Sequence, residues 1–133
     1  MDPEEKKAIM LLKSVIFHYH GLDAEEIQNL EETAIELEAH EELEWANLFV
    51  AKNFLTAFDR AREYLSTIIG DYPKKKRVKY IYMVWESNNL KGYITELEAT
   101  AMLKLARDWK VEDELKDIVR KEKYSSKEAP FPK

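Results

Sequence analysis

Three carboxylates, Asp23, Glu26 and Glu98, follow two glycine turns of similar composition and are weak candidates for binding a divalent cation. The first turn has the sequence HGLDAEEI (20–27) and the second KGYITELE (91–98). Carboxylate oxygens bind hard cations such as Ca²⁺, which takes about six or more oxygen ligands. Lys91 places an ammonium group in the second turn, and this positive charge repels a cation.

The same residues have a second interpretation as helix starts. Asp23 is followed by Glu26, and Thr95 by Glu98, which is the spacing of a capping box in which each side chain accepts a backbone N–H of the other residue. Such a cap contributes on the order of 1 kcal/mol to a helix end. The pattern favours the structural interpretation and no metal site, and cation binding stays the alternative.

The histidines give a weaker metal-binding signal. His18 and His20 are two residues apart, a spacing that does not place both side chains on one helical face. Glu36, His40 and Glu44 fall at four-residue steps and could share a face, but most polar stripes of this kind are simply solvated. The chain has no cysteine and no HExxH pattern, so we predict no transition-metal site.

Acidic residues dominate one long stretch of the chain, although the net charge is only −5. No Lys or Arg lies between Lys13 and Lys52, and the carboxylates in this interval include Glu31 and Glu38. The stretch predicts an acidic helical face. Such a face either keeps the protein soluble or docks a basic protein partner, and in the second case Glu31 and Glu38 are partner-binding candidates.

A basic run, PKKKRVKY (73–80), is the second candidate surface for a partner and resembles a nuclear-localisation signal. Its cations are Lys74, Lys75, Lys76 and Arg77, and they stand at an expected helix N-terminus, where the helix dipole disfavours positive charge. An acidic partner or a phosphate would relieve this unfavourable placement. Duplex DNA usually meets a basic face, so nucleic acid is disfavoured as the partner of an acidic chain.

Motifs for catalysis and cofactor binding are absent from the sequence. There is no GxSxG, no glycine-rich phosphate loop and no cysteine nucleophile. The tyrosines and tryptophans have the distribution of packing residues in a helical bundle. We therefore expect no enzymatic activity and no cofactor.

Helices must position these residues, because the composition favours an all-α fold. The 133 residues include only 3 Gly and 4 Pro, and 45% of them are hydrophobic. No apolar run approaches the roughly 20 residues that a membrane span needs. The N-terminal segment is acidic before it is apolar, unlike a secretion signal, so we expect a soluble, cytoplasmic protein.

One domain is expected over residues 1–123, followed by a loosely ordered tail over residues 124–133. The expected helices cover 4–19, 23–40, 41–69, 75–88, a segment opened by Thr95, and 111–121. Between residues 43 and 58 the apolar side chains point in nearly every direction around a helix, which is typical of a buried one. Residues 41–69 are therefore expected to form the buried central element, as one helix or as two joined near Lys52 and Asn53.

Two segments of the chain match when it is shifted by 72 residues. The matched pairs include Asp23 with Thr95, Glu26 with Glu98, Leu30 with Met102, and Ala34 with Ala106. The match predicts a bundle of two helix-turn-helix repeats around a buried central helix. Chance is the alternative, because amphipathic helices with capping boxes align easily.

Residues 8–37 and 81–109 resemble the tellurite-resistance TerB-like family of small all-helical domains. In that family a helix runs into an Asp-Gly turn, and a glutamate opens the next helix. Gly92, Thr95 and Glu98 stand in the matching places, whereas His20 and Lys91 replace the aspartates.

The resemblance implies a non-catalytic interaction or stress-response module that acts through protein–protein contacts. A divalent-metal-responsive regulatory protein of the tellurite-resistance type is the alternative. The identity of the protein partner does not follow from the sequence, and a homo-oligomer stays open.

Overall fold

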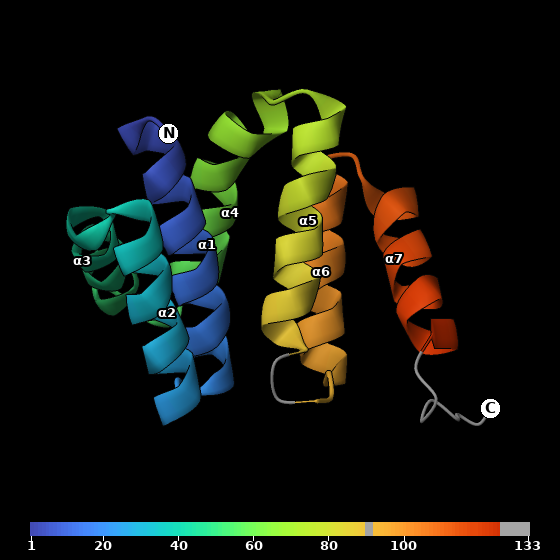
Figure 1. The fold of residues 1–133 in the computed structure, drawn as a ribbon, viewed down its shortest axis with the longest axis horizontal. Helices are drawn as coiled ribbons and strands as arrows, with labels where there is room; N and C mark the ends of the chain where they lie inside the picture. The colour runs from blue at the N-terminus through green and yellow to red at the C-terminus, as the bar shows by residue number, and fades with distance from the viewer. Residues whose placement is uncertain (90–91, 126–133) are drawn as a thin grey trace. The chain divides into compact units, whose positions relative to one another are not determined.

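The computed structural model describes residues 1–89 and 92–125, and all regular structure in these ranges is helical (Figure 1). This confirms the all-α prediction. In chain order the elements are α1 (Pro3–His20), α2 (Ala24–Leu37), α3 (His40–Ala51), α4 (Ala57–Ile68), the 3₁₀ turn η1 (Ile69–Asp71), α5 (Lys74–Asn88), α6 (Glu96–Asp108) and α7 (Glu112–Ser125). Within these ranges, no helix has both the length and the apolar character needed to cross a membrane.

These helices form two compact units, each a small bundle. The first unit is Met1–Asp71 and holds α1 to α4 with η1, and the second starts at Tyr72 and holds α5, α6 and α7. A single domain over residues 1–123 stays a prediction. Helix α7 continues to Ser125, and the rest of the expected tail, residues 126–133, lies outside the described part of the chain.

Helix α1 is the central helix of the first unit and packs against α2, α3 and α4. Asp2 caps its start by accepting the backbone N–H of Glu5 at 2.8 Å, and Pro3 occupies the first turn, where its missing N–H costs no hydrogen bond. Gly21 ends it with φ +103°, a left-handed conformation that favours glycine. The buried apolar residues of α1 cover nearly its whole circumference: Ala8, Ile9, Met10, Leu11, Leu12, Val15, Ile16 and Phe17.

Residues 41–69 form two helices, which is the second of the two expected forms, since α3 ends at Ala51 and α4 begins at Ala57. The expectation that this segment is a central element buried on all sides is wrong. In and beside this break Leu48, Phe54 and Leu55 are 67%, 63% and 97% exposed. The Asn53 side chain accepts the backbone N–H of Leu55 at 3.0 Å, which stabilises a turn in place of a helix. The expected joint near Lys52 and Asn53 is therefore a five-residue loop, Lys52 to Thr56.

The second unit has an up-down-up arrangement in which α5 contacts both α6 and α7 (Figure 1). Helices α5 and α7 therefore run parallel to each other. The core of this unit contains Tyr80, Ile81, Val84, Met102, Leu105, Ala106, Trp109, Val111 and Leu115.

Helices α2 and α6 end in the same local geometry at the predicted spacing of 72 residues. Glu38 and Lys110 follow them with φ +53° and +58°, although neither is a glycine. In both places the next residue donates its backbone N–H to a carbonyl in the last helical turn at 2.8 Å. The two helix ends are thus alike, while the predicted repeat of whole units stays a prediction.

Candidate interaction grooves

The glutamates of the two glycine turns serve as capping residues in the structure. In the first turn Asp23 accepts the N–H of Glu26 at 2.9 Å, and Glu26 accepts the N–H of Asp23 at 3.1 Å. In the second, Thr95 accepts the N–H of Glu98 at 3.2 Å, and Glu98 accepts that of Thr95 at 2.9 Å. Both glutamates are buried, at 4% and 5% exposure, so their carboxylates belong to the helix starts.

No group of three metal-ligating side chains comes together in the part of the chain that the structure describes. Glu36 lies on α2, whereas His40 begins α3 after an intervening turn, so the four-residue spacing of these two residues does not continue along one helix. Lys91, which replaces a family aspartate, lies outside the described residues.

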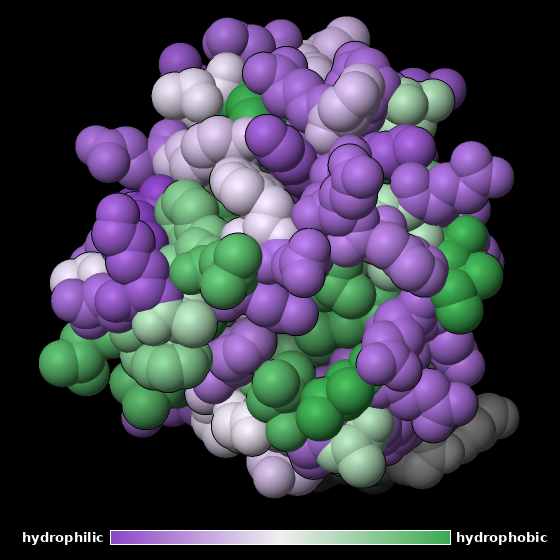
Figure 2. Space-filling view, turned by 90° about the vertical axis from the view of Figure 1, so that its left-hand side faces the viewer, coloured by the Kyte–Doolittle hydropathy of each residue, from purple (hydrophilic) through white to green (hydrophobic). Residues whose placement is uncertain are grey.

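A groove of about 560 Å³ lies between α2 and α3. It is lined by Glu31, Ala34, Ile35, His40, Glu41, Leu43, Glu44 and Asn47. A second hollow of about 490 Å³ shares Ile35, His40 and Glu41 and adds Glu38 and Glu42. We call these two connected hollows the acidic groove. Figure 2 shows hydrophilic residues around separate hydrophobic patches on the face of the molecule that it presents.

The acidic groove brings together the two acidic residues that the sequence indicated as partner-binding, Glu31 and Glu38. Its apolar part is Ile35, which is 65% exposed, with Ala34 and Leu43 beside it. Sequence reasoning missed Ile35, because it lies outside the row of buried apolar residues of α2, which contains Leu30 and Ala34. An isoleucine off that row is the signal that could have indicated an exposed apolar position.

Two lysines of α1 lie at the border of the acidic stretch. Lys6 donates from Nζ to the backbone carbonyl of Glu38 at 3.1 Å, and the ammonium of Lys7 lies 5.1 Å from the centre of the Trp45 ring. Both contacts are with neutral groups. Carboxylates predominate in the lining of the acidic groove, and the Lys6 ammonium lies at its border beside Glu38.

The four candidates of the basic run, residues 74–77, have two different roles. Two of them make contacts that stabilise the fold, and the other two line a surface groove. Arg77 donates from Nε to the carbonyl of Tyr72 at 2.9 Å and from Nη1 to the carbonyl of Trp109 at 2.7 Å. Lys74 forms a 2.8 Å ion pair with Glu114, and this hydrogen bond lowers the pKa of the Glu114 carboxyl. These two cations hold α5 within its own unit, which sequence reasoning did not anticipate.

Lys75 and Lys76 face a different environment from their neighbours. Lys75 is exposed, and the ammonium of Lys76 lies 4.6 Å from the centre of the Tyr72 ring. Both residues line a second groove, on α5 and α7, that is described below. Of the four basic candidates, Lys75 and Lys76 are the two that line a surface groove.

No family model, curated protein or solved structure matches this chain, so comparison with known proteins assigns it neither a family nor a function. Membership of the TerB-like family therefore stays a prediction from residues 8–37 and 81–109. The proposals below depend on the surfaces of this chain alone.

Proposed function

We propose that this protein is a non-catalytic interaction module whose first unit binds a basic, amphipathic helix of a partner protein in the acidic groove. The observation that supports the proposal is the combination of an exposed isoleucine, Ile35, with the carboxylates of Glu31, Glu38, Glu41 and Glu44 around one groove. A stress-response role of the TerB-like kind belongs to the same proposal.

Helix-in-groove recognition explains why both kinds of residue are needed. Apolar side chains of a partner helix, spaced three or four residues apart, bury themselves in the groove and provide affinity. Opposite charges along the rim orient the helix and speed its approach, and their effect weakens as salt screens them. The acidic groove thus fits a partner with Leu or Ile on one face and Lys or Arg beside it.

The alternative proposal, a divalent-metal-responsive regulator, has less support. The carboxylates of all three candidates, Asp23, Glu26 and Glu98, each accept a backbone N–H at a helix start. A cation bound there would have to replace these hydrogen bonds, and both glutamate side chains would have to leave their buried positions. Calorimetric titration with Ca²⁺, Mn²⁺ and Zn²⁺ tests this alternative directly.

The proposed function is tested with an 18-residue helical peptide that carries Leu on one face and Lys on its flanks. We expect the wild-type protein to bind it in fluorescence anisotropy, more tightly at low salt. The double variant Glu31→Lys/Glu44→Lys should bind at least tenfold more weakly. The control Glu63→Lys/Asp117→Lys makes the same charge change at exposed positions outside the groove and should bind like wild type. Equal affinity of the groove variant and this control would refute the proposal.

A further inference from the structure

A second groove, of about 730 Å³, lies along α5 and α7 in the second unit. It is lined by Pro73, Lys75, Lys76, Val78, Lys79, Tyr82 and Ile118. We call it the lysine-rimmed groove. Helices α5 and α7 run in the same direction, and side chains from both helices line this groove.

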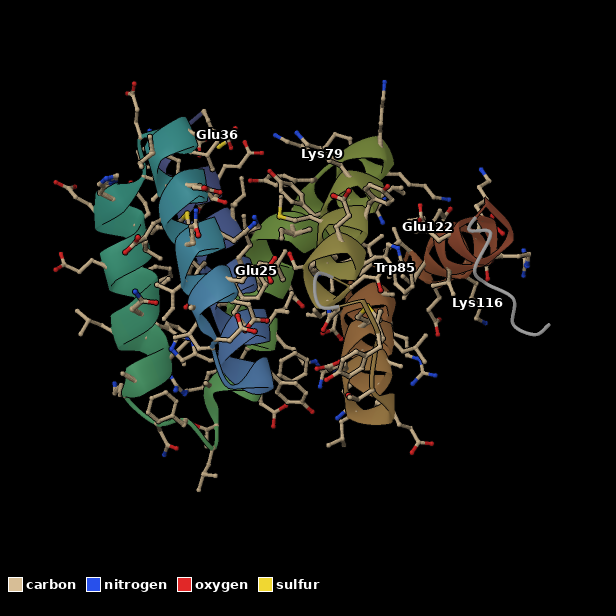
Figure 3. The ribbon with its side chains drawn as sticks, turned by 60° about the horizontal axis from the view of Figure 1, so that its bottom comes forward. Glu25, Glu36, Lys79, Trp85, Lys116 and Glu122 are labelled. Atoms are coloured by element: carbon tan, nitrogen blue, oxygen red, sulfur yellow. The ribbon has the colours of Figure 1, made fainter. Side chains whose placement is uncertain are left out.

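The floor and the rim of the lysine-rimmed groove follow from helical spacing on α5. Val78 and Tyr82 are four residues apart and, with Ile118 of α7, form the apolar floor. Lys75 and Lys79 have the same spacing on the neighbouring row, and both are exposed. Figure 3 labels Lys79 on α5. An apolar floor beside two exposed ammonium groups fits an amphipathic ligand of negative charge.

Negatively charged residues lie next to Tyr82, at the end of the groove away from Pro73. The pKa of the Tyr82 phenol is raised, chiefly by the negative charge of Glu86, then by burial and by Glu122 of α7. In Figure 3, Trp85 of α5 and Glu122 of α7 lie on the sides of the two helices that face each other. The lining of the groove therefore begins with lysines near the start of α5 and ends at Tyr82, and the carboxylates of Glu86 and Glu122 act on that end.

We propose that the lysine-rimmed groove binds an amphipathic helix of a partner protein, with the acidic residues of that helix at the end where Lys75 and Lys79 lie. The partner's apolar side chains bury themselves against Val78, Tyr82 and Ile118, and its opposite end is neutral or basic where it passes Glu86 and Glu122. This surface is opposite in charge to the acidic groove. The chain would then bind two different helices and act as an adaptor between their proteins.

The distribution of charge favours a short helix over a polyanion. A nucleic acid strand that followed the groove would carry its phosphates past Glu86 and Glu122, where like charges repel. The α2 helix of a second copy is also acidic, with Ile27 and Ile35 exposed, and is the competing occupant that the test must exclude.

The test uses the full-length protein and an acetylated, amidated 18-residue peptide with Leu on one face, Glu along its first half and Gln along its second. We expect binding by isothermal titration calorimetry, and at least a tenfold loss of affinity in Lys75→Glu/Lys79→Glu. The matched control Lys104→Glu/Lys116→Glu changes two exposed lysines outside the groove and should bind like wild type. Affinity of the groove variant equal to that of the wild type would overturn the proposal.

A second set of measurements tests the floor and the polarity of the groove. Ile118→Ser, once circular dichroism shows a wild-type fold, should bind the peptide at least fivefold more weakly.

A peptide with Glu in both halves should bind the variant Glu86→Gln at least threefold more tightly than the wild type, because its second acidic half then meets no carboxylate at that position. No gain would refute the proposed polarity.

Two further outcomes would overturn the proposal, and a third measurement separates it from the proposed function. Tighter binding of a 12-nucleotide single strand than of the peptide would replace the helix with nucleic acid. Self-association of the wild type in sedimentation, lost in Lys75→Glu/Lys79→Glu, would replace the partner with a second copy. Retained binding of the basic peptide in that variant would show that the acidic groove functions independently, so the two proposals can fail separately.

Discussion

The guanidinium of Arg77 donates to the backbone carbonyl of Trp109 at 2.7 Å and so ties the first turn of α5 to the residue that ends α6. The carbonyls at a helix end lack partners within the helix, and a charged donor satisfies one of them here. A second bond, from Nε to the carbonyl of Tyr72, fixes the orientation of the same side chain.

Arg77→Gln should therefore lower the free energy of unfolding by about 1.5–3 kcal/mol, the usual range for hydrogen bonds to charged groups. Urea denaturation measures the loss. The control is Lys75→Gln, which removes an exposed charge from the same turn and should change the stability little. Equal stability of both variants would show that the helix dipole, and not the contact with Trp109, dominates at this helix start.

The two capping boxes predict equal sensitivity at Asp23 and Thr95. Either residue changed to Ala should cost about 0.5–2 kcal/mol, because a backbone N–H in the first turn loses its acceptor. Thr100→Ala, at an exposed position within α6, is the matched control and should cost less. A loss of Ca²⁺ or Mn²⁺ affinity in the capping variants would contradict the structural role.

The indole of Trp109 is fully buried, and in the described part of the chain its Nε1 has no hydrogen-bond partner. Trp109→Phe removes this unpaired donor, whose burial costs about 1–3 kcal/mol, and so offsets part of the lost packing. We expect Trp109→Phe to cost well under the about 3–5 kcal/mol expected for Trp109→Ala. Thermal unfolding measures the stability of both variants. Similar losses of stability in the two would indicate that the indole Nε1 has a hydrogen-bond partner.

The loop between α3 and α4 predicts a contrast between two leucines. Leu65 of α4 is fully buried, so Leu65→Ala should cost about 2–5 kcal/mol. Leu55 is almost fully exposed, and Leu55→Ala should be close to neutral. Chemical denaturation of both variants checks the placement of the loop, and a large loss for Leu55→Ala would contradict it.

The pKa of the Tyr82 phenol is raised from its ordinary value, chiefly by Glu86. Glu86→Gln should lower this pKa toward that of a free tyrosine, because an anionic phenolate no longer faces that carboxylate. In the wild type the protonated phenol is favoured by the fold, so this contribution to stability is present below the unfolded pKa and is lost as pH rises through the folded value. Absorbance titration of tyrosine ionisation, with Tyr82→Phe to assign the transition, measures the shift.

Local sequence signals predicted the features that depend on neighbours in the chain. The capping boxes at Asp23 and Thr95 and the stop at Gly21 follow from side-chain chemistry within a few residues. The acidic interval also predicted a surface, and the structure brings Glu31 and Glu38 to one groove.

Features that depend on distant residues could not be predicted in this way. The apolar pattern around Phe54 suggested a buried helix, but the loop there is held by Asn53 and by the guanidinium of Arg60, which donates to the carbonyls of Phe49 and Asn53 at 3.0 and 2.8 Å. Arg77 looked like one cation in a run, since its acceptor Trp109 lies on another helix. The spacing of residues in the sequence predicts neither the carbonyls that Arg60 binds nor the carbonyl that Arg77 binds.

The same loop is a potential site of proteolysis in the folded chain. Phe54 and Leu55 are exposed bulky residues of the kind that chymotrypsin cleaves after, yet a protease needs an extended strand, and Arg60 holds this segment in a tight turn. Cleavage therefore requires the Arg60 contacts to break, a local opening that leaves the rest of the first unit folded. The rate of nicking at this loop then reports how much of the protein has the Arg60 hydrogen bonds open, and it can change without any change in global stability.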